Sequence, residues 1–127
     1  MKKMILMGFG VLLVVLCIAS ANPKQGQTTA ADTATAWAEH VSVPTADWED
    51  MFFIINNLGA TNAMAYKVYG YPVYGGTAYE TIVDSTQIAA SGQALIKISN
   101  TAYAEIAIQV IKVTTATSCQ VEYILKP

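Results

Sequence analysis

The side chains that most often carry out catalysis are scarce in this sequence. His40 is the only histidine, and it lies between Glu39 and Val41 in a stretch with the composition of a β-strand. With no second histidine, no zinc ligand set can be assembled, and no motif in the sequence places a serine and an aspartate beside His40 for a Ser-His-Asp arrangement. The sequence therefore predicts a protein that is not an enzyme and has no cofactor, with His40 as an ordinary strand residue.

Two cysteines, Cys17 and Cys119, are present. Cys17 lies inside an N-terminal apolar run, so removal of that run would leave Cys119 as a single thiol and make an intramolecular disulfide impossible. A lone cysteine at the start of an apolar strand behaves as a small hydrophobic side chain. We expect Cys119 to be buried and unreactive.

The densest acidic cluster is Asp47, Glu49 and Asp50 around Trp48. Carboxylate-rich loops hold calcium in many extracellular proteins. The spacing matches no calcium-loop pattern, however, and acids before a strand also serve to keep a loop solvated. These three residues are weak calcium candidates.

Tyrosines gather around one Gly-Gly loop, at Tyr66, Tyr69, Tyr71, Tyr74 and Tyr79. The alternation of a strand puts Tyr69 and Tyr71 on one face and Tyr66 on the other. Exposed tyrosine rings with polar tips suit a protein interface or stacking on sugars. The alternative is aromatic pairing across strands that only stabilises the sheet. Tyr69, Tyr71, Tyr74 and Tyr79 form the candidate ligand or partner surface.

The elements that must position these side chains follow a period of two. From Trp37 onward, short runs rich in Val, Ile, Thr and Tyr alternate with Gly, Asn, Asp and Ser clusters, which is typical of an antiparallel sandwich or barrel. We expect about seven strands and an immunoglobulin-like Greek-key sandwich, with a jelly roll carrying an extra edge strand as the alternative. The expected strands are 37–43, 51–56, 64–71, 78–84, 94–99, 102–113 and 119–126.

Two of these strands carry specific expectations. Met51 to Asn56 is a nearly continuous apolar run, which predicts a central strand covered on both sides. Residues 102–113 should place Ile106, Ile108 and Val110 in one inward row.

The first residues indicate export. Met1-Lys2-Lys3 precedes an uncharged run from Met4 to Pro23, and Ala19-Ser20-Ala21 fits a signal-peptidase site. Cleavage after Ala21 is the default. The rival is an uncleaved helical anchor through residues 4–21, because the run approaches the roughly 17 to 25 residues needed to span a bilayer. Both alternatives place the folded domain outside the cytoplasm, since Lys2 and Lys3 hold the N-terminus inside.

Three segments follow from this division. Residues 1–21 form the signal peptide or hydrophobic anchor helix, residues 22–35 form a small, polar stalk rich in Thr and Ala, and residues 36–127 form the β-sandwich domain. A stalk of this composition buries too little surface to become ordered alone. The alternative for residues 22–35 is an added edge strand once a partner sheet is available.

Charge excludes one class of partner. Five lysines, nine acids and no arginine follow Ala21. Nucleic-acid binding requires clustered Lys and Arg to neutralise phosphates, so no nucleic-acid partner is expected.

The segment DWEDMFFIINNLGATNAMAYKVYGYP and the ending YAEIAIQVIKVTTATSCQVEYI resemble small immunoglobulin-like modules of phage virion and bacterial surface proteins, across residues 47–124. That resemblance implies a module that decorates, cements or extends a larger assembly. We therefore expect a non-enzymatic structural or adhesive module, secreted, on the cell surface or membrane-anchored, with protein partners or copies of itself. The alternative is an extracellular carbohydrate-binding module that uses the tyrosines.

Overall fold

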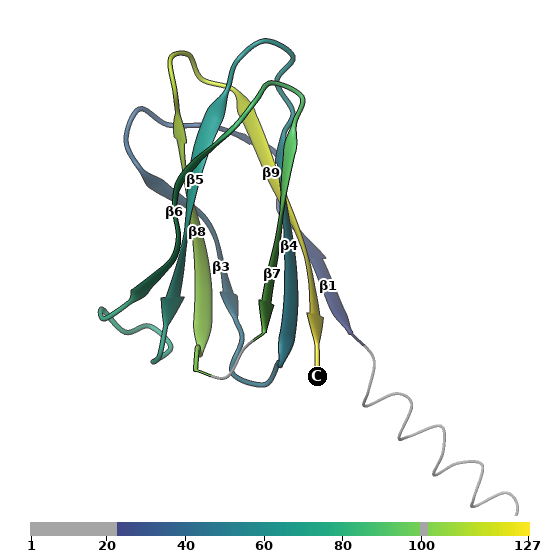
Figure 1. Cartoon of the computed structure of the whole chain (residues 1–127), viewed down its shortest axis with the longest axis vertical. Coiled ribbons are helices and arrows are strands. Elements are labelled where there is room, and N and C mark those ends of the chain that lie inside the picture. The colour runs from purple at the N-terminus through teal and green to yellow at the C-terminus, as the bar shows by residue number, and fades with distance from the viewer. Residues whose placement is uncertain (1–22, 100–101) are drawn as a thin grey trace, which may run out of the picture.

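The computed structural model describes residues 23–99 and 102–127, which form two antiparallel β-sheets packed face to face (Figure 1). The all-β, two-sheet prediction is confirmed, and no helix occurs among the described residues. The hydrophobic helix expected at residues 1–21 lies outside them. The strands are β1 (Lys24–Gln27), β2 (Ala31–Asp32), β3 (Ala38–Pro44), β4 (Asp50–Asn57), β5 (Met64–Tyr71), β6 (Glu80–Ile88), β7 (Gln93–Ser99), β8 (Glu105–Lys112) and β9 (Ser118–Lys126).

The strand order is that of a jelly roll. One sheet runs β1-β9-β4-β7, with β2 also pairing with β9, and the other runs β3-β8-β5-β6. After β2, every connection except β5–β6 passes from one sheet to the other, whereas an immunoglobulin-like sandwich keeps several consecutive pairs within one sheet. The immunoglobulin-like topology is therefore wrong, and the jelly-roll alternative, which is itself built from Greek keys, fits. The period-two pattern identifies strands but does not say which sheet each strand joins.

The segment predicted to be a flexible stalk is part of the sandwich. Lys24 pairs with Leu125 and Gln27 with Glu122, and Ala31 pairs with Cys119 further along the same strand. Thr28 N–H and Thr33 N–H also donate to the carbonyls of Val121 and Thr117, at 2.8 Å each. The edge-strand alternative describes residues 24–27 and 31–32 correctly, because β9 supplies hydrogen-bond partners that the segment lacks by itself.

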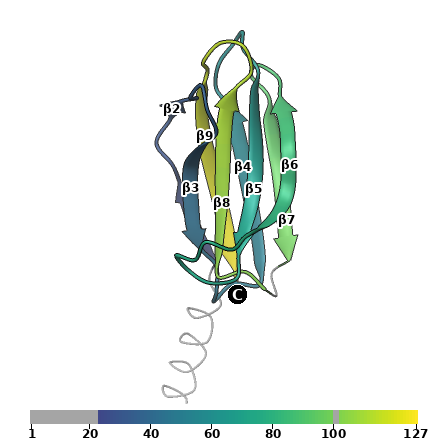
Figure 2. The ribbon, with the colours of Figure 1, turned by 90° about the vertical axis from the view of Figure 1, so that its left-hand side faces the viewer.

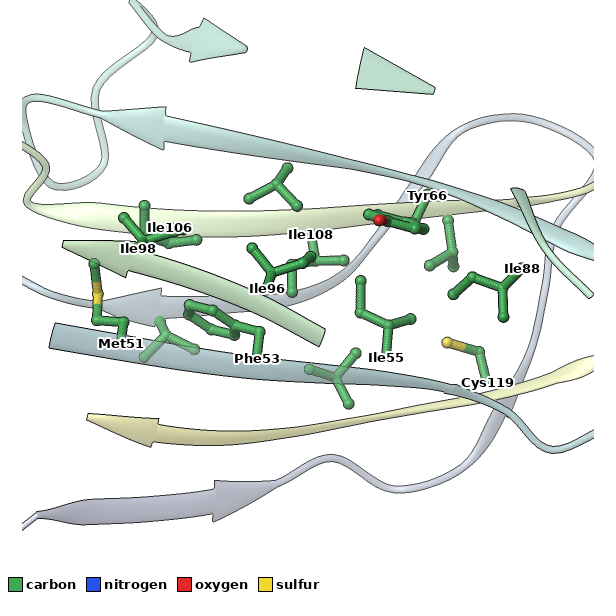
Figure 3. Packing of buried hydrophobic residues seen from close by; sticks show 14 of the residues in the cluster. Met51, Phe53, Ile55, Tyr66, Ile88, Ile96, Ile98, Ile106, Ile108 and Cys119 are labelled. Atoms are coloured by element: carbon green, nitrogen blue, oxygen red, sulfur yellow. The ribbon is translucent and has the colours of Figure 1, made fainter. Parts of the chain in front are cut away.

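The core lies between the two sheets and consists of the inward-facing residues of both (Figure 3). Met51, Phe53 and Ile55 point inward from β4 and are completely buried. Ile106, Ile108 and Val110 form the predicted inward row of β8 and are buried as well. A fully buried side chain of this kind contributes about 1.5 to 3 kcal/mol, so these two rows are a large part of what holds the layers together.

The central strand β4 is covered on one side only. Its buried residues alternate with half-buried ones, which include Phe52 and Ile54 on the outer face of the sheet. The prediction that β4 is covered on both sides is therefore wrong. Its apolar run gives the β1-β9-β4-β7 sheet an apolar outer face.

A buried polar side chain joins three loops at the pole opposite the C-terminus. Asn57 is only 2% exposed, and its Nδ2 donates to the carbonyls of Asn62, Ile88 and Ala89 at 2.8, 3.2 and 3.1 Å. Its Oδ1 accepts hydrogen bonds from Gly59 N–H and from the Thr117 hydroxyl, at 3.1 and 2.8 Å. The β4–β5, β6–β7 and β8–β9 connections are fixed together by this one residue.

Candidate functional site

The predicted tyrosine surface lies at the end of the β3-β8-β5-β6 sheet where β5 ends, the pole at the bottom of Figure 2. Tyr66 points into the core and is 6% exposed, whereas Tyr69 and Tyr71 lie on the other face of the same strand, as expected from alternation. The Tyr79 ring packs against both, with ring centroids 4.7 Å from Tyr69 and 5.9 Å from Tyr71. The structure thus brings together three of the four predicted tyrosines.

The loop that carries Tyr74 is fastened to the sheet by Glu105. Gly75 N–H donates to Oε2 of Glu105 at 3.0 Å, and the Ser42 hydroxyl donates to Oε1. These two hydrogen bonds hold the pKa of Glu105 below its usual value, with Ser42 as the larger cause. Gly75 has φ of +69°, a left-handed conformation that glycine adopts at no steric cost. Glu105 therefore ties the loop to the sheet through Gly75, and Ser42 orients the carboxylate that does so.

A second carboxylate supports the same end of the sheet. The Tyr103 hydroxyl donates to Oε2 of Glu80 at 2.7 Å, and this hydrogen bond is the main cause that raises the pKa of Tyr103. The pKa of Tyr71 is also raised, first by partial burial and then by the negative charges of Glu39 and Glu105. Carboxylates thus surround the aromatic rings, and the surface combines apolar rings with negative charge.

The loop presents side chains that project into solvent. Tyr74 is 67% exposed, Val73 is 66% exposed and Tyr79 is 58% exposed. Large apolar side chains that project from a fixed loop are suited to contact with another molecule. Sequence reasoning missed Val73 and Glu105. The Gly-Gly loop beside the tyrosines signals Val73, but no signal reveals Glu105, whose partner Gly75 lies 30 residues away.

The calcium candidates do not assemble into a ligand set. Asp50 Oδ1 accepts a hydrogen bond from the Ser99 hydroxyl at 3.2 Å, while Asp47 and Glu49 line an open pocket of about 390 Å³ beside Trp48. Within residues 23–99 and 102–127, no three His, Cys, Asp or Glu side chains lie close enough together to hold a metal ion.

His40 and Cys119 have structural surroundings. The pairing of β3 with β8 shifts register between Glu39 and Val41, so His40 is a bulged residue. Its Nε2 lies 2.7 Å from the Thr28 hydroxyl, and burial lowers the pKa of the imidazole. Cys119 is completely buried, and burial raises the pKa of its thiol to about 12. A thiol in this state is protonated at neutral pH and unreactive.

The proposed processing residues Ala19 and Ala21 lie outside the described residues. Among the residues that are described, no helix is long and apolar enough to cross a membrane.

Comparison with known proteins gives a likeness of fold only. No protein-family model matches the sequence, and no curated protein matches it either. The crystal structure of PirA is similar with a TM-score of 0.50 at 8% identity, covering 80% of this chain and 92% of that one. The Yersinia pseudotuberculosis-derived mitogen gives a TM-score of 0.50 at 7% identity, covering 80% and 86%.

A pilus protein also appears among the similar structures. The Bacillus endospore appendages give a TM-score of 0.49 at 10% identity, covering 84% of this chain and 89% of that one. A prophage-derived protein and a Triatoma virus capsid protein are similar at 12% identity. The two structures at a TM-score of 0.50 share the fold alone, and the resemblance to phage virion and bacterial surface modules stays a prediction.

Proposed function

We propose that the protein is a non-enzymatic β-sandwich module, exported or membrane-tethered, that has a structural or adhesive role in a surface or virion assembly. The observation that carries the proposal is an exposed aromatic surface on the β5–β6 connection. Val73, Tyr74 and Tyr79 project into solvent there, and the Tyr79 ring packs on the half-buried Tyr69 and Tyr71. A ring that is already packed in place, as Tyr79 is, loses less conformational entropy on binding, which favours association. The basic, apolar N-terminus supports export, because it has the form of a signal peptide or anchor.

The chemistry around the tyrosines favours contact over catalysis. Both oxygens of Glu105 are hydrogen-bonded within the protein, and Glu80 accepts from Tyr103. These carboxylates position the loop and the sheet, while the aromatic rings remain accessible. In the proposed function the tyrosines bind a protein partner or another component of the assembly.

The test is cosedimentation of the protein with envelope preparations. The protein is expressed from all 127 residues and purified in its native form, whether or not the N-terminal segment has been cleaved. Intact-mass measurement shows whether that form begins at Met1 or Asn22. We expect the wild type to cosediment with envelope preparations and Y74A/Y79A to bind about tenfold more weakly, because exposed aromatic residues dominate interfaces. Leu58→Ala is the matched control, since Leu58 is 50% exposed on the β4–β5 loop. A wild type that stays monomeric at high concentration and binds no envelope material would refute the proposal.

A second function is carbohydrate binding, which the exposure of the Tyr74 and Tyr79 rings favours. Aromatic rings stack on the apolar faces of sugars, and the phenol oxygen supplies a polar contact. Polysaccharide pull-down and glycan-array binding should then weaken when Tyr71 or Tyr74 is changed to Ala. Absence of glycan binding by the wild type removes this alternative.

A further inference from the structure

The outer face of the β1-β9-β4-β7 sheet has an apolar centre. Phe52 pairs in register with Lys97 on β7 and with Ile124 on β9, and the next outward residue of β4, Ile54, pairs with Leu95 on β7. Phe52, Ile54 and Ile124 are half-buried, and Leu95 is 66% exposed. Four large apolar side chains therefore form one continuous patch on a face that no other part of the described chain covers.

Polar and charged side chains surround this centre. The ammonium groups of Lys97 and Lys126 lie 5.5 and 5.6 Å from the centroid of the Phe52 ring. Gln25, Gln27 and other residues line an open groove of about 410 Å³ next to Phe52 and Ile54. An apolar centre inside a polar rim is the anatomy of a protein–protein interface.

We propose that this face binds the same face of a second copy of the chain around a two-fold axis parallel to the strands, between β4 and β9. The inference rests on the proposed role in an assembly and supplies a contact between copies. Such a rotation places each outward residue of β4 opposite the β9 residue that is its register partner. Asp50 then faces Lys126 of the second copy, Phe52 faces Ile124, and Asn56 faces Gln120.

Charge complementarity selects this axis. Asp50 and Lys126 form two symmetric contacts of opposite charge, Phe52 and Ile124 two apolar contacts, and the amides of Asn56 and Gln120 can exchange hydrogen bonds. The poorest contact is that of Ile54 with Glu122 of the second copy, because it sets an apolar side chain against a carboxylate.

A two-fold axis perpendicular to the strands gives a worse match. It would set Asp50 against Asn56 and Ile124 against Glu122, so the charges of Asp50 and Lys126 would lose their opposite partners. The parallel axis is therefore the one that the register favours.

The size of the face predicts a weak, reversible dimer. Four strands spaced about 4.8 Å apart and a central strand of eight residues give a face of roughly 19 by 26 Å, or about 500 Å². Two such faces bury about 1,000 Å² in total, which is the lower limit of specific interfaces. We expect a dissociation constant in the micromolar range.

The experiment is analytical ultracentrifugation of the full chain over a concentration series, without envelope material. D50K and K126D should each weaken the dimer about tenfold or more, because each substitution places like charges together twice. An equimolar mixture of D50K and K126D should form a heterodimer with both charge pairs restored, and D50K/K126D should dimerise like the wild type. Lys67→Asp on the opposite sheet is the matched charge control and should leave the dimer unchanged. Since the heterodimer forms only from folded chains, it separates lost binding from lost folding.

Three results would overturn the inference: a wild type that is monomeric up to about 1 mM, a mixture of D50K and K126D that forms no heterodimer, or growth of the wild type beyond the dimer through this face. Tyr74 and Tyr79 lie on the β5–β6 connection of the other sheet, so Y74A/Y79A should dimerise normally. If Y74A/Y79A still dimerises but no longer cosediments with envelope material, the result supports both the proposed function and the dimer. A dimer in a wild type that binds no envelope material supports this face and counts against the adhesive role.

Discussion

Asn57→Ala tests whether one buried amide holds three loops together. The substitution leaves the Thr117 hydroxyl and the Ile88 carbonyl without their buried partner. Each buried polar group left unpaired costs about 1 to 3 kcal/mol, so the expected loss in the free energy of unfolding is about 2 to 6 kcal/mol. Domains of this size have only about 5 to 15 kcal/mol in total, so the variant should be close to unfolding.

Urea denaturation followed by circular dichroism measures this loss, with the wild-type slope as a check that the transition stays two-state. Asn62→Ala is the matched control, because the Asn62 amide makes one exposed contact of 3.4 Å with the Ala116 carbonyl and should cost less than about 0.5 kcal/mol. Asn57→Asp should lose at least as much as Asn57→Ala at neutral pH, since it sets a charged oxygen against three carbonyl oxygens. An Asn57→Ala variant within about 1 kcal/mol of the wild type would show that water replaces the amide and that the loops are held by other contacts.

Further predictions concern packing, thiol chemistry and pH. Gly70→Ala should destabilise the protein by about 1 to 3 kcal/mol in urea, because the added Cβ would lie 2.4 Å from the Tyr103 ring; an unchanged midpoint would contradict this. Cys119 should resist iodoacetamide at pH 8 until urea is added, as peptide mass spectrometry can show, and rapid labelling of the native protein would count against its burial. Burial lowers the pKa of His40 in the folded protein below its usual 6.5, so the unfolded chain binds the proton at a higher pH than the folded protein does. The free energy of unfolding should therefore fall as pH drops from 6.5 toward the lower folded-state pKa. His40→Gln should flatten this decline in thermal melts, and equal pH dependence in both proteins would contradict the assignment.

The sequence predicted strands best where one face of a strand is buried and the other is not. The strand Met64–Tyr71 was predicted with its observed bounds, because alternation places Tyr66 and Val68 in the core and leaves Lys67 and Tyr69 outside. The strand predicted at 78–84 extends to Ile88 as β6, and its polar residues Ser85, Thr86 and Gln87 are exposed at the edge of the sheet. Edge strands have little apolar surface to bury, so their pattern is weak.

Pairings between distant parts of the chain could not be predicted. Lys24 pairs with Leu125 across almost the whole sequence, and nothing in the composition of residues 22–35 indicates β9 as a neighbour. The candidate surface was predictable in part. Alternation placed Tyr69 and Tyr71 together, but the contact of Tyr79 with both depends on the path of the β5–β6 connection. The hydrogen bond from Gly75 to Glu105 likewise depends on the order of strands in the sheet.

The antiparallel pairing of β1 with β9 also determines how the sandwich would respond to mechanical force. Lys24 begins β1 beside Leu125, so the described chain enters and leaves at one pole (Figure 1). Tension between residue 24 and the C-terminus would peel β1 from β9, breaking the hydrogen bonds one after another. Tension between residue 24 and a molecule gripping the opposite pole would pull β1 along its own axis, so that all of its hydrogen bonds to β9 share the load, since these bonds lie perpendicular to the strands. The β1–β9 pair should therefore separate at a low force in the first geometry and resist a much higher force in the second.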